Sequence, residues 1–174
     1  MLVLVNPKKI FITQGYHGVH RVIDLVSRLS GVTKLTLDDI DQMGPGDMLH
    51  VETPLNPTGE ARNLAYYKER ARAVGAILTV DSTFAPPPLQ NPIELGADLV
   101  MHSGTKYIGG HSDMLCGIVI VHPDRVKEGW QKKLYEDRLV LGSVMGSFEG
   151  WLGIRSLRTL HLRVTRQAQT AEAL

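Results

Sequence analysis

The alternation of apolar and amphipathic segments predicts an α/β fold: a doubly wound, mostly parallel sheet with helices on both faces. Residues 76–80 and 99–101 are short runs without a polar face, as expected of strands that helices cover on both sides. Residues 63–74 instead repeat apolar side chains at helical spacing and end at Gly75, a residue typical of helix ends. Strands and helices that alternate in this way favour a parallel sheet.

Residues 10–51 are expected to contribute three strands and two helices. The strands span residues 10–13, 32–37 and 48–51, and the helices span residues 19–29 and 38–43. Gly31 would end the first helix, and a turn at residues 44–47 would follow the second. The face of the first helix that is expected to be buried contains Val22, Ile23, Val26 and Leu29.

Residues 116–174 are expected to add one strand and two helices. The sequence predicts a strand at residues 116–121, a surface helix at 124–137, a turn at 142–147 and a long helix from Phe148. The buried stripe expected of the long helix contains Trp151, Ile154, Leu157 or Leu160, and Val164. The arginines of the same helix are expected to form a solvated or interface face without a catalytic role: Arg155, Arg158, Arg163 and Arg166.

The composition gives no sign of a nucleic-acid or membrane partner. The chain has 19 lysines and arginines against 18 aspartates and glutamates, which gives a net charge of +1. No apolar run approaches the length of a membrane span. Cys116 is the only cysteine, so no disulfide can form within the chain, and we expect a reducing, cytoplasmic location. The 174 residues are enough for one domain, residues 1–174, with its own core.

Polar residues follow four of the predicted strands. Tyr16, Glu52, Asp81 and Ser103 each lie just beyond the C-terminal end of an apolar run, and ligands bind at this edge of open parallel sheets. A carboxylate at the mouth of a buried strand is unfavourable unless it is paired, so Asp81 is expected to meet a cationic partner. Each residue alone could be a turn former or a helix cap, but four together predict a site.

A polar loop at residues 103–113 places one lysine between two apolar strands. Lys106 would become a usable nucleophile if burial and a nearby positive charge lowered its pKa from about 10.4. The hydroxyls of Ser103 and Thr105 could face the same anion as the amine, and the glycines at 104, 109 and 110 would let the backbone approach a ligand. This segment alone leaves open an ordinary loop lysine.

The segment SGTKYIGGHSD, residues 103–113, closely resembles the cofactor-lysine segment of the Cys/Met-metabolism family of pyridoxal-phosphate enzymes. The resemblance covers residues 15–167 and implies the large domain of a fold type I transferase, with pyridoxal 5′-phosphate as the cofactor. It implies that Lys106 carries the cofactor as a Schiff base and that Ser103 and Thr105 bind its phosphate.

The same resemblance assigns the residues around the cofactor ring. It implies that Tyr16 stacks on the pyridine ring and that Asn56, in a Glu-Thr-Pro-Leu-Asn-Pro loop, hydrogen-bonds the 3-hydroxyl oxygen. Asp81 would pair with the protonated ring nitrogen, and Thr83 would pack on the ring face opposite Tyr16. The expected catalytic residues are Lys106 and Tyr16.

Three further segments, residues 15–18, 83–88 and 150–158, are most similar to the fungal branch of cystathionine γ-synthase. The implied activity is trans-sulfuration in methionine biosynthesis, with γ-replacement on an activated homoserine. The implied partners are small amino-acid substrates and, in the full-length family, further copies of the chain in a homo-oligomer. Homoserine sulfhydrylase and cystathionine lyase activities remain open within the family.

Parts of the family pattern are not matched. No stretch resembles its N-terminal arm, its upstream phosphate loop or its C-terminal domain with a carboxylate-binding arginine, so we expect a chain truncated at both ends and inactive alone. The alternative is a non-catalytic remnant. Ser82 stands where the family usually has asparagine. His17 and His20 lack the further ligands of a metal site, so no metal is expected.

Overall fold

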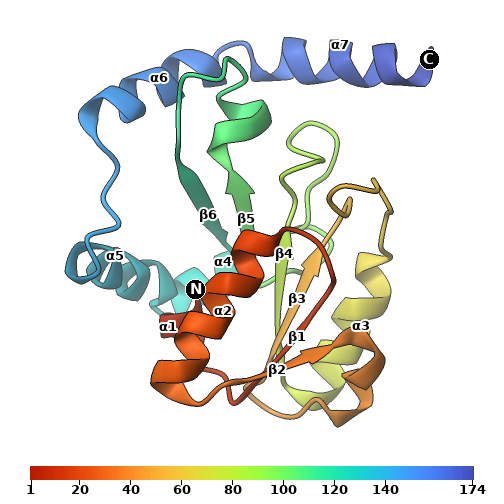
Figure 1. Cartoon of the computed structure of the whole chain (residues 1–174), viewed down its shortest axis with the longest axis vertical. Coiled ribbons are helices and arrows are strands. Elements are labelled where there is room, and N and C mark those ends of the chain that lie inside the picture. Colours follow the sequence, from red (N-terminus) through yellow and green to blue (C-terminus); the bar gives the residue numbers. More distant parts are fainter.

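The computed structural model describes residues 1–174 and confirms the α/β prediction (Figure 1). Its six strands are β1 (Lys9–Ile12), β2 (Thr33–Thr36), β3 (Met48–Glu52), β4 (Ile77–Asp81), β5 (Leu99–Ser103) and β6 (Gly117–Val121). They form one sheet in the order β2-β1-β3-β4-β5-β6. All neighbouring strands run parallel except β5 and β6, which are antiparallel, so the sheet is mostly parallel as predicted.

The strand order reverses direction once, between β1 and β3. The chain places β2 on one side of β1 and then adds β3, β4, β5 and β6 on the other side. In open parallel sheets, such a reversal leaves a crevice outside the carboxyl ends of the two central strands, because the connections leave them in opposite directions. The loops after β1 and β3 border this crevice.

One face of the sheet is covered by α2 (His17–Ser30), with the short helix α1 (Leu2–Val5) nearby. The buried side chains of this layer are Ile10, Ile12, Ile23, Val32 and Met48, and Val19 and Val26 pack against them. Gly31 ends α2 in the left-handed region, with φ 76°, as predicted. The expected burial of Val22 and Leu29 is wrong: both are exposed, because the sheet contacts only a narrow stripe at Val19, Ile23 and Val26.

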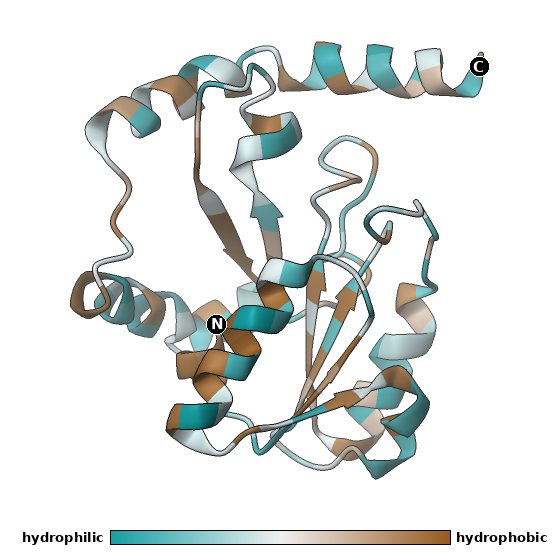
Figure 2. Ribbon diagram, in the orientation of Figure 1, coloured by the Kyte–Doolittle hydropathy of each residue, from teal (hydrophilic) through white to brown (hydrophobic).

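The other face is covered by α3 (Leu64–Val74) and by the 3-10 helix η1 (Leu37–Gln42). The larger core lies here, where Leu64, Tyr67 and Ala71 pack on the strands, as the helical spacing predicts. Asn63 caps α3 by accepting hydrogen bonds from two backbone amides of the first turn, and Gly75 ends it. Figure 2 shows that hydrophobic residues concentrate on the central strands between these layers.

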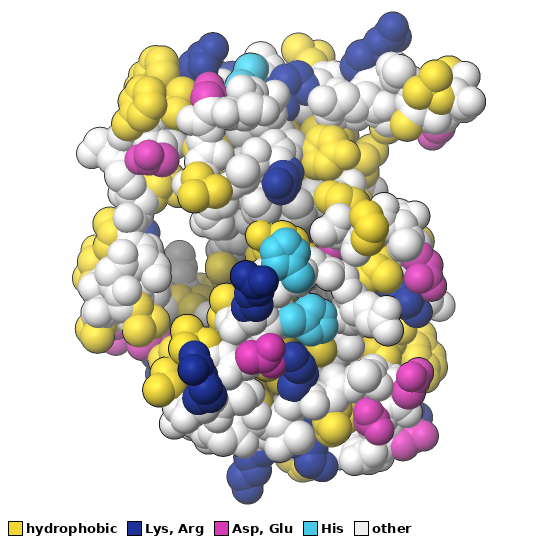
Figure 3. Space-filling model, in the orientation of Figure 1, with side chains coloured by type: hydrophobic (Ala, Val, Ile, Leu, Met, Phe, Trp, Pro, Cys, Tyr) yellow, Lys and Arg dark blue, Asp and Glu magenta, His cyan; other side chains and the backbone are white.

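The surface helix predicted at residues 124–137 is divided. The structure has α4 (Pro123–Lys127) and α5 (Trp130–Val140), because Gly129 adopts a left-handed conformation, with φ 86°, that interrupts a right-handed helix. Hydrophobic side chains gather on the surface of α5, of the segment after it and of α6 (Ser147–Leu157), along one side of the molecule in Figure 3.

The long helix predicted from Phe148 is also divided, into α6 and α7 (Leu160–Glu172). Its buried stripe agrees with the expected one at Leu160 and Val164, but Trp151, Ile154 and Leu157 are exposed. The buried positions are four residues apart: Leu152, Ser156, Leu160 and Val164. Two apolar faces are present on this segment, and periodicity does not tell which of them meets the sheet. None of the helices is long and apolar enough to cross a membrane.

Replacing Leu160 with alanine should lower the free energy of unfolding by about 2–5 kcal/mol, because a buried leucine is truncated and leaves a cavity. Leu160 is 8% exposed and packs with Ile108 and Val164, whereas Leu162, two residues later, is 69% exposed. Leu162→Ala is therefore the matched control, with an expected change within about 0.5 kcal/mol. Urea unfolding of both variants measures the difference. Equal losses in the two variants would contradict the burial of Leu160.

Candidate functional site

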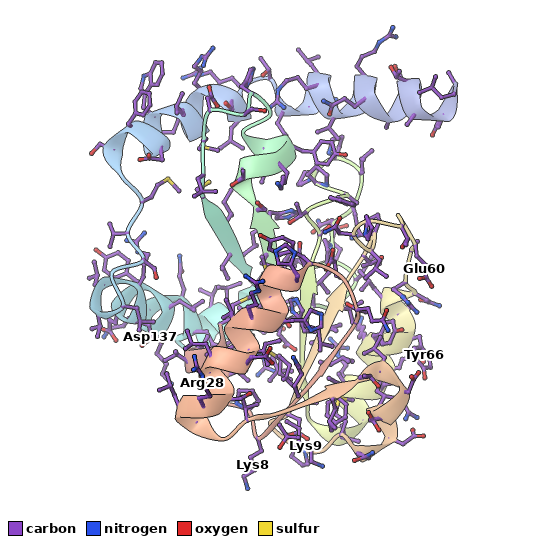
Figure 4. All side chains as sticks on the ribbon, in the orientation of Figure 1. Lys8, Lys9, Arg28, Glu60, Tyr66 and Asp137 are labelled. Atoms are coloured by element: carbon purple, nitrogen blue, oxygen red, sulfur yellow. The ribbon has the colours of Figure 1, made fainter.

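The carboxyl ends of β1, β3, β4 and β5 lie at one edge of the sheet, since these four strands are parallel. Figure 4 shows the orientation: Lys8 and Lys9 mark the edge where β1 begins, and Glu60, in the segment after β3, lies toward the opposite edge. The strand ends and the segments that follow them at this opposite edge carry every residue of the predicted site. They contain Tyr16, Asn56, Asp81, Thr83, Ser103, Thr105 and Lys106.

Glu52, the last residue of β3, joins the loops after β1 and β3. One carboxylate oxygen accepts a hydrogen bond from the backbone N–H of Tyr16 at 2.9 Å, and the other accepts from the backbone N–H of Asn56 at 2.9 Å. Burial raises the pKa of Glu52, and the two backbone N–H donors oppose that rise. A single buried carboxylate therefore fixes the backbone of two residues predicted to contact the cofactor ring.

Asp81 stands beside Glu52 in the paired register of β4 and β3 and is only 5% exposed. Its Oδ1 accepts a hydrogen bond from the backbone N–H of Thr83 at 2.9 Å, and the Thr83 hydroxyl accepts one from the backbone N–H of Ser103 at 2.8 Å. Oδ2 of Asp81 makes no hydrogen bond within the chain. The loops after β4 and β5 are thus joined, and one carboxylate oxygen is left for a cationic partner.

Lys106 lies in η2 (Gly104–Ile108), a distorted helical turn directly after β5. Its φ of −88° and ψ of −118° are not helical, so the turn kinks at the lysine. The neighbouring Thr105 hydroxyl accepts a hydrogen bond from the backbone N–H of Cys116 at 3.3 Å, and Gly104 donates one to the Cys116 carbonyl at 2.9 Å. The side chain of Lys106 is exposed, so the burial that the sequence analysis considered for this amine is not observed.

Two buried histidines that the sequence reasoning missed, His50 and His102, lie near the site on opposite faces of the sheet. His50 Nδ1 is 2.8 Å from the Thr79 hydroxyl, and burial lowers the pKa of His50 to about 4 against the opposing attraction of Asp81. Burial also lowers the pKa of His102. Both histidines are neutral near pH 7. The available signal was a histidine within or directly after an apolar run, in β3 and in β5.

One arginine of α7 was assigned to a solvated or interface face, and that assignment is wrong. Arg163 donates hydrogen bonds to the carbonyl oxygens of Tyr107 at 2.7 Å and Ile108 at 3.2 Å, within the loop that carries Lys106. Arg155, Arg158 and Arg166 are exposed, in keeping with the predicted surface face.

The polar groups at this edge that can still form hydrogen bonds or ion pairs fit pyridoxal phosphate. Lys106 supplies an amine without a hydrogen bond or ion pair, and Asp81 supplies a nearly buried anionic acceptor for a protonated ring nitrogen. The Ser103 hydroxyl makes no hydrogen bond within the chain, and the Thr105 hydroxyl keeps its hydrogen to donate, as a phosphate requires. Tyr16 is 46% exposed and offers an aromatic face. The role of each residue toward the cofactor stays a prediction.

The edge with these residues is distinct from a hollow elsewhere in the fold. A hollow of about 340 Å³ lies where β4 and β5 begin, and its lining includes Lys68, Asp98 and Arg125. None of the predicted site residues lines it. Asp98 there accepts hydrogen bonds from the backbone N–H of Leu78 and from Arg125, both at 2.8 Å, so its carboxylate is engaged in joining β4, β5 and α4.

Comparison with known proteins supports the resemblance. The model of the family described as "Cys/Met metabolism PLP-dependent enzyme" matches residues 9–174. Cystathionine γ-synthase of Escherichia coli is 37% identical over 169 residues, which cover 91% of this chain and 42% of the relative. Cystathionine γ-lyase of Saccharomyces cerevisiae is 36% identical over 174 aligned residues, with the same shares of 91% and 42%. The chain thus spans less than half the length of these curated relatives.

Solved structures show the same fold. A cystathionine γ-synthase from Xanthomonas oryzae, in complex with aminoacrylate and cysteine, superposes with a TM-score of 0.79 at 32% identity. The superposition covers 91% of this chain and 43% of that one. A cystathionine γ-lyase from Lactobacillus plantarum, complexed with L-serine, gives a TM-score of 0.78 at 30% identity, over 88% and 41% of the two chains.

The buried, neutral side chain of His50 predicts a loss of stability in acid. The folded state keeps His50 neutral down to a pKa of about 4, whereas the unfolded chain takes up a proton near pH 6.5. The free energy of unfolding should therefore fall as the pH drops from 6.5 toward 4, and His50→Gln should remove part of that slope. His161, exposed on α7, provides the control variant His161→Gln. Equal slopes for wild type and His50→Gln, measured by urea unfolding, would contradict the burial of His50.

Proposed function

Because the chain belongs to the Cys/Met metabolism family of pyridoxal-phosphate-dependent enzymes, we propose that it forms the cofactor-binding part of an enzyme that acts on sulfur amino acids. The specific proposal is γ-replacement of the cystathionine γ-synthase type, in which the thiol of cysteine displaces an activated γ-substituent of homoserine. The observation that carries the proposal is the meeting of four strand ends, with Tyr16, Asn56, Asp81 and Ser103 at one edge of the sheet.

Pyridoxal phosphate, when bound, supplies the electron sink that accepts the electrons of a substrate carbon as its proton leaves. In our proposal, Asp81 holds the proton on the ring nitrogen, because an anionic oxygen in a nearly buried position favours the protonated, cationic form of its partner. Lys106 binds the cofactor covalently and carries a proton at Nζ. Its exposed position gives the amine freedom to reach both the cofactor and the substrate.

The other residues bind and orient the cofactor. Tyr16 and Thr83 would hold the pyridine ring between them, and the Asn56 amide would donate to the 3-hydroxyl oxygen. The backbones of Tyr16 and Asn56 are held by one carboxylate, that of Glu52, which limits their relative movement. The hydroxyls of Ser103 and Thr105 donate to the phosphate. The binding of both ends of the cofactor by loops of a single sheet favours one orientation of its reactive carbon.

The lyase activities of the family are the second candidate. They are supported by the relatives, since the yeast cystathionine γ-lyase and the E. coli γ-synthase have nearly equal identities of 36% and 37% with this chain. Product analysis separates the candidates: the synthase proposal requires cystathionine from cysteine and an O-acylated homoserine. Cleavage of cystathionine without formation of that product would favour a lyase.

The location and assembly are also proposals. We place the protein in the cytoplasm, on the basis of its single cysteine, although two plant relatives are chloroplastic. A homo-oligomer is supported by the exposed hydrophobic side chains on α5 and α6, since large exposed apolar patches are typical of protein interfaces.

Lys106 should be the lysine that reacts with pyridoxal phosphate. Addition of the cofactor is expected to produce a visible absorbance band, and borohydride should then fix the cofactor to the peptide that contains Lys106. Lys106→Ala should lose this product, whereas Lys132→Ala, at an exposed position of α5, should retain it. Mass spectrometry of the digested protein gives the answer. Fixation mainly at Lys68 or Lys132 would rule out the assignment.

Asp81→Asn keeps the size of the side chain and removes its charge. When the chain is joined to the C-terminal domain of a family member, this change should lower turnover of an O-acylated homoserine with cysteine by at least about 100-fold, because the carboxylate stabilises the ring proton most as charge develops on the cofactor. Cofactor occupancy, measured by absorbance, should change much less. Asp124→Asn, at the exposed start of α4, is the control and should leave both quantities unchanged. Equal losses of occupancy and turnover would make Asp81 a structural residue only.

A further inference from the structure

The loop that carries Lys106 is held from above by a single arginine of α7. Figure 1 shows this helix crossing over the turn that follows β5. The Arg163 guanidinium donates to the carbonyl oxygens of Tyr107 at 2.7 Å and Ile108 at 3.2 Å, the two residues directly after the lysine. It also donates to the carbonyl oxygen of Ser156 at 3.0 Å, in α6. One side chain therefore ties the loop to both C-terminal helices.

The guanidinium is fixed by more than the loop itself. Its Nε donates to the Thr159 hydroxyl at 3.1 Å, so all three guanidinium nitrogens have partners, and each partner is a neutral oxygen. A planar, charged guanidinium group that donates in several directions forms stronger hydrogen bonds than neutral donors do. Gly110 makes room for the guanidinium, because a Cβ at that position would collide with Nη1 of Arg163.

Packing joins the same two elements. Ile108 forms a buried cluster with Leu160 and Val164 of α7, and Tyr107 packs against it. Hydrophobic contacts resist separation of the helix and the loop, but they are not directional. The hydrogen bonds of Arg163 fix the orientation of the loop backbone, since they require the carbonyl groups of Tyr107 and Ile108 to face the helix.

The amine of Lys106 has no fixed contact of its own. Its side chain is exposed, and it makes no hydrogen bond or ion pair with the chain. The location from which the amine can react is therefore decided by the backbone of residues 104–108, and that backbone is kinked at the lysine. The carbonyl groups that Arg163 holds begin at the next residue.

We propose that Arg163 is a positioning residue for Lys106: its guanidinium, bound to the carbonyl oxygens of Tyr107, Ile108 and Ser156, fixes the turn that presents the amine to the cofactor. This inference rests on the proposed function, because it concerns the reaction of Lys106 with pyridoxal phosphate. The competing explanation is a tie that stabilises α7 and has no influence on the lysine.

The test compares the rates at which borohydride fixes pyridoxal phosphate to two lysines of the same sample. Lys132, exposed on α5, serves as the internal reference. In Arg163→Gln, the ratio of the Lys106 rate to the Lys132 rate should fall by about 10-fold or more, since small displacements of a reacting group cost factors of this order. Arg163→Lys keeps the charge and should recover part of the ratio. Arg166→Gln, exposed on the same helix, should match wild type.

A second readout needs no cofactor. The backbone N–H groups of Gly109 and Gly110 donate to the carbonyls of Gly104 and Lys106, both at 2.7 Å, and loosening of the turn should make them exchange with solvent several-fold faster in Arg163→Gln. Circular dichroism of each variant checks that the chain is folded. If Arg163→Gln does not fold, Arg163→Lys decides by the same two measurements.

The outcomes separate the two proposals. A wild-type ratio in folded Arg163→Gln or, failing that, in Arg163→Lys would overturn the positioning role, and so would unchanged exchange at Gly109 and Gly110. Wild-type protein that is not fixed at Lys106 at all would instead contradict the proposed function, and the exchange rates would then decide whether Arg163 holds the turn.

Discussion

The buried carboxylate of Glu52 is the contact on which the site depends. It lies where the strand order reverses, and it receives backbone hydrogen bonds from Tyr16 on one side and Asn56 on the other. The close approach requires glycine at position 15, since a Cβ there would collide with the carboxylate, and the φ of Gly15 is 145°. Two further hydrogen bonds join Thr13, just after β1, to His50 and Glu52 of β3, but only the Glu52 carboxylate reaches both Tyr16 and Asn56 in the loops themselves.

The remainder of the site follows from the register of a parallel sheet. Glu52 pairs with Asp81, Asp81 holds the backbone of Thr83, and the Thr83 hydroxyl holds the backbone of Ser103. Together these contacts link the ends of β3, β4 and β5, so segments far apart in sequence share one edge of the sheet. Arg163 completes this arrangement from the C-terminal helices, which places a residue of the last helix in control of the turn after β5.

The parts that were predictable from the sequence depend on local rules. Strands without a polar face, and helices ended by Gly31 and Gly75, follow from burial on two sides and from the left-handed conformation that glycine tolerates. The errors arose where tertiary contacts decide. Two apolar faces compete on α6 and α7, and only packing against Ile108 selects the one with Leu160. Arg163 resembles its exposed neighbours in sequence. Its partners are two carbonyl groups of a loop more than 50 residues away, and no local pattern predicts that contact.

A backbone amide NMR titration with pyridoxal phosphate tests most directly whether the four loops form one site. A single site predicts that the largest shift changes fall on Tyr16, Asn56, Thr83 and Lys106, and that all of them follow one dissociation constant. The opposite edge provides the contrast, since the hollow lined by Lys68 and Arg125 also offers cationic groups to a phosphate. Changes concentrated around that hollow, with Tyr16, Asn56, Thr83 and Lys106 unaffected, would contradict a cofactor site at the carboxyl ends of the strands.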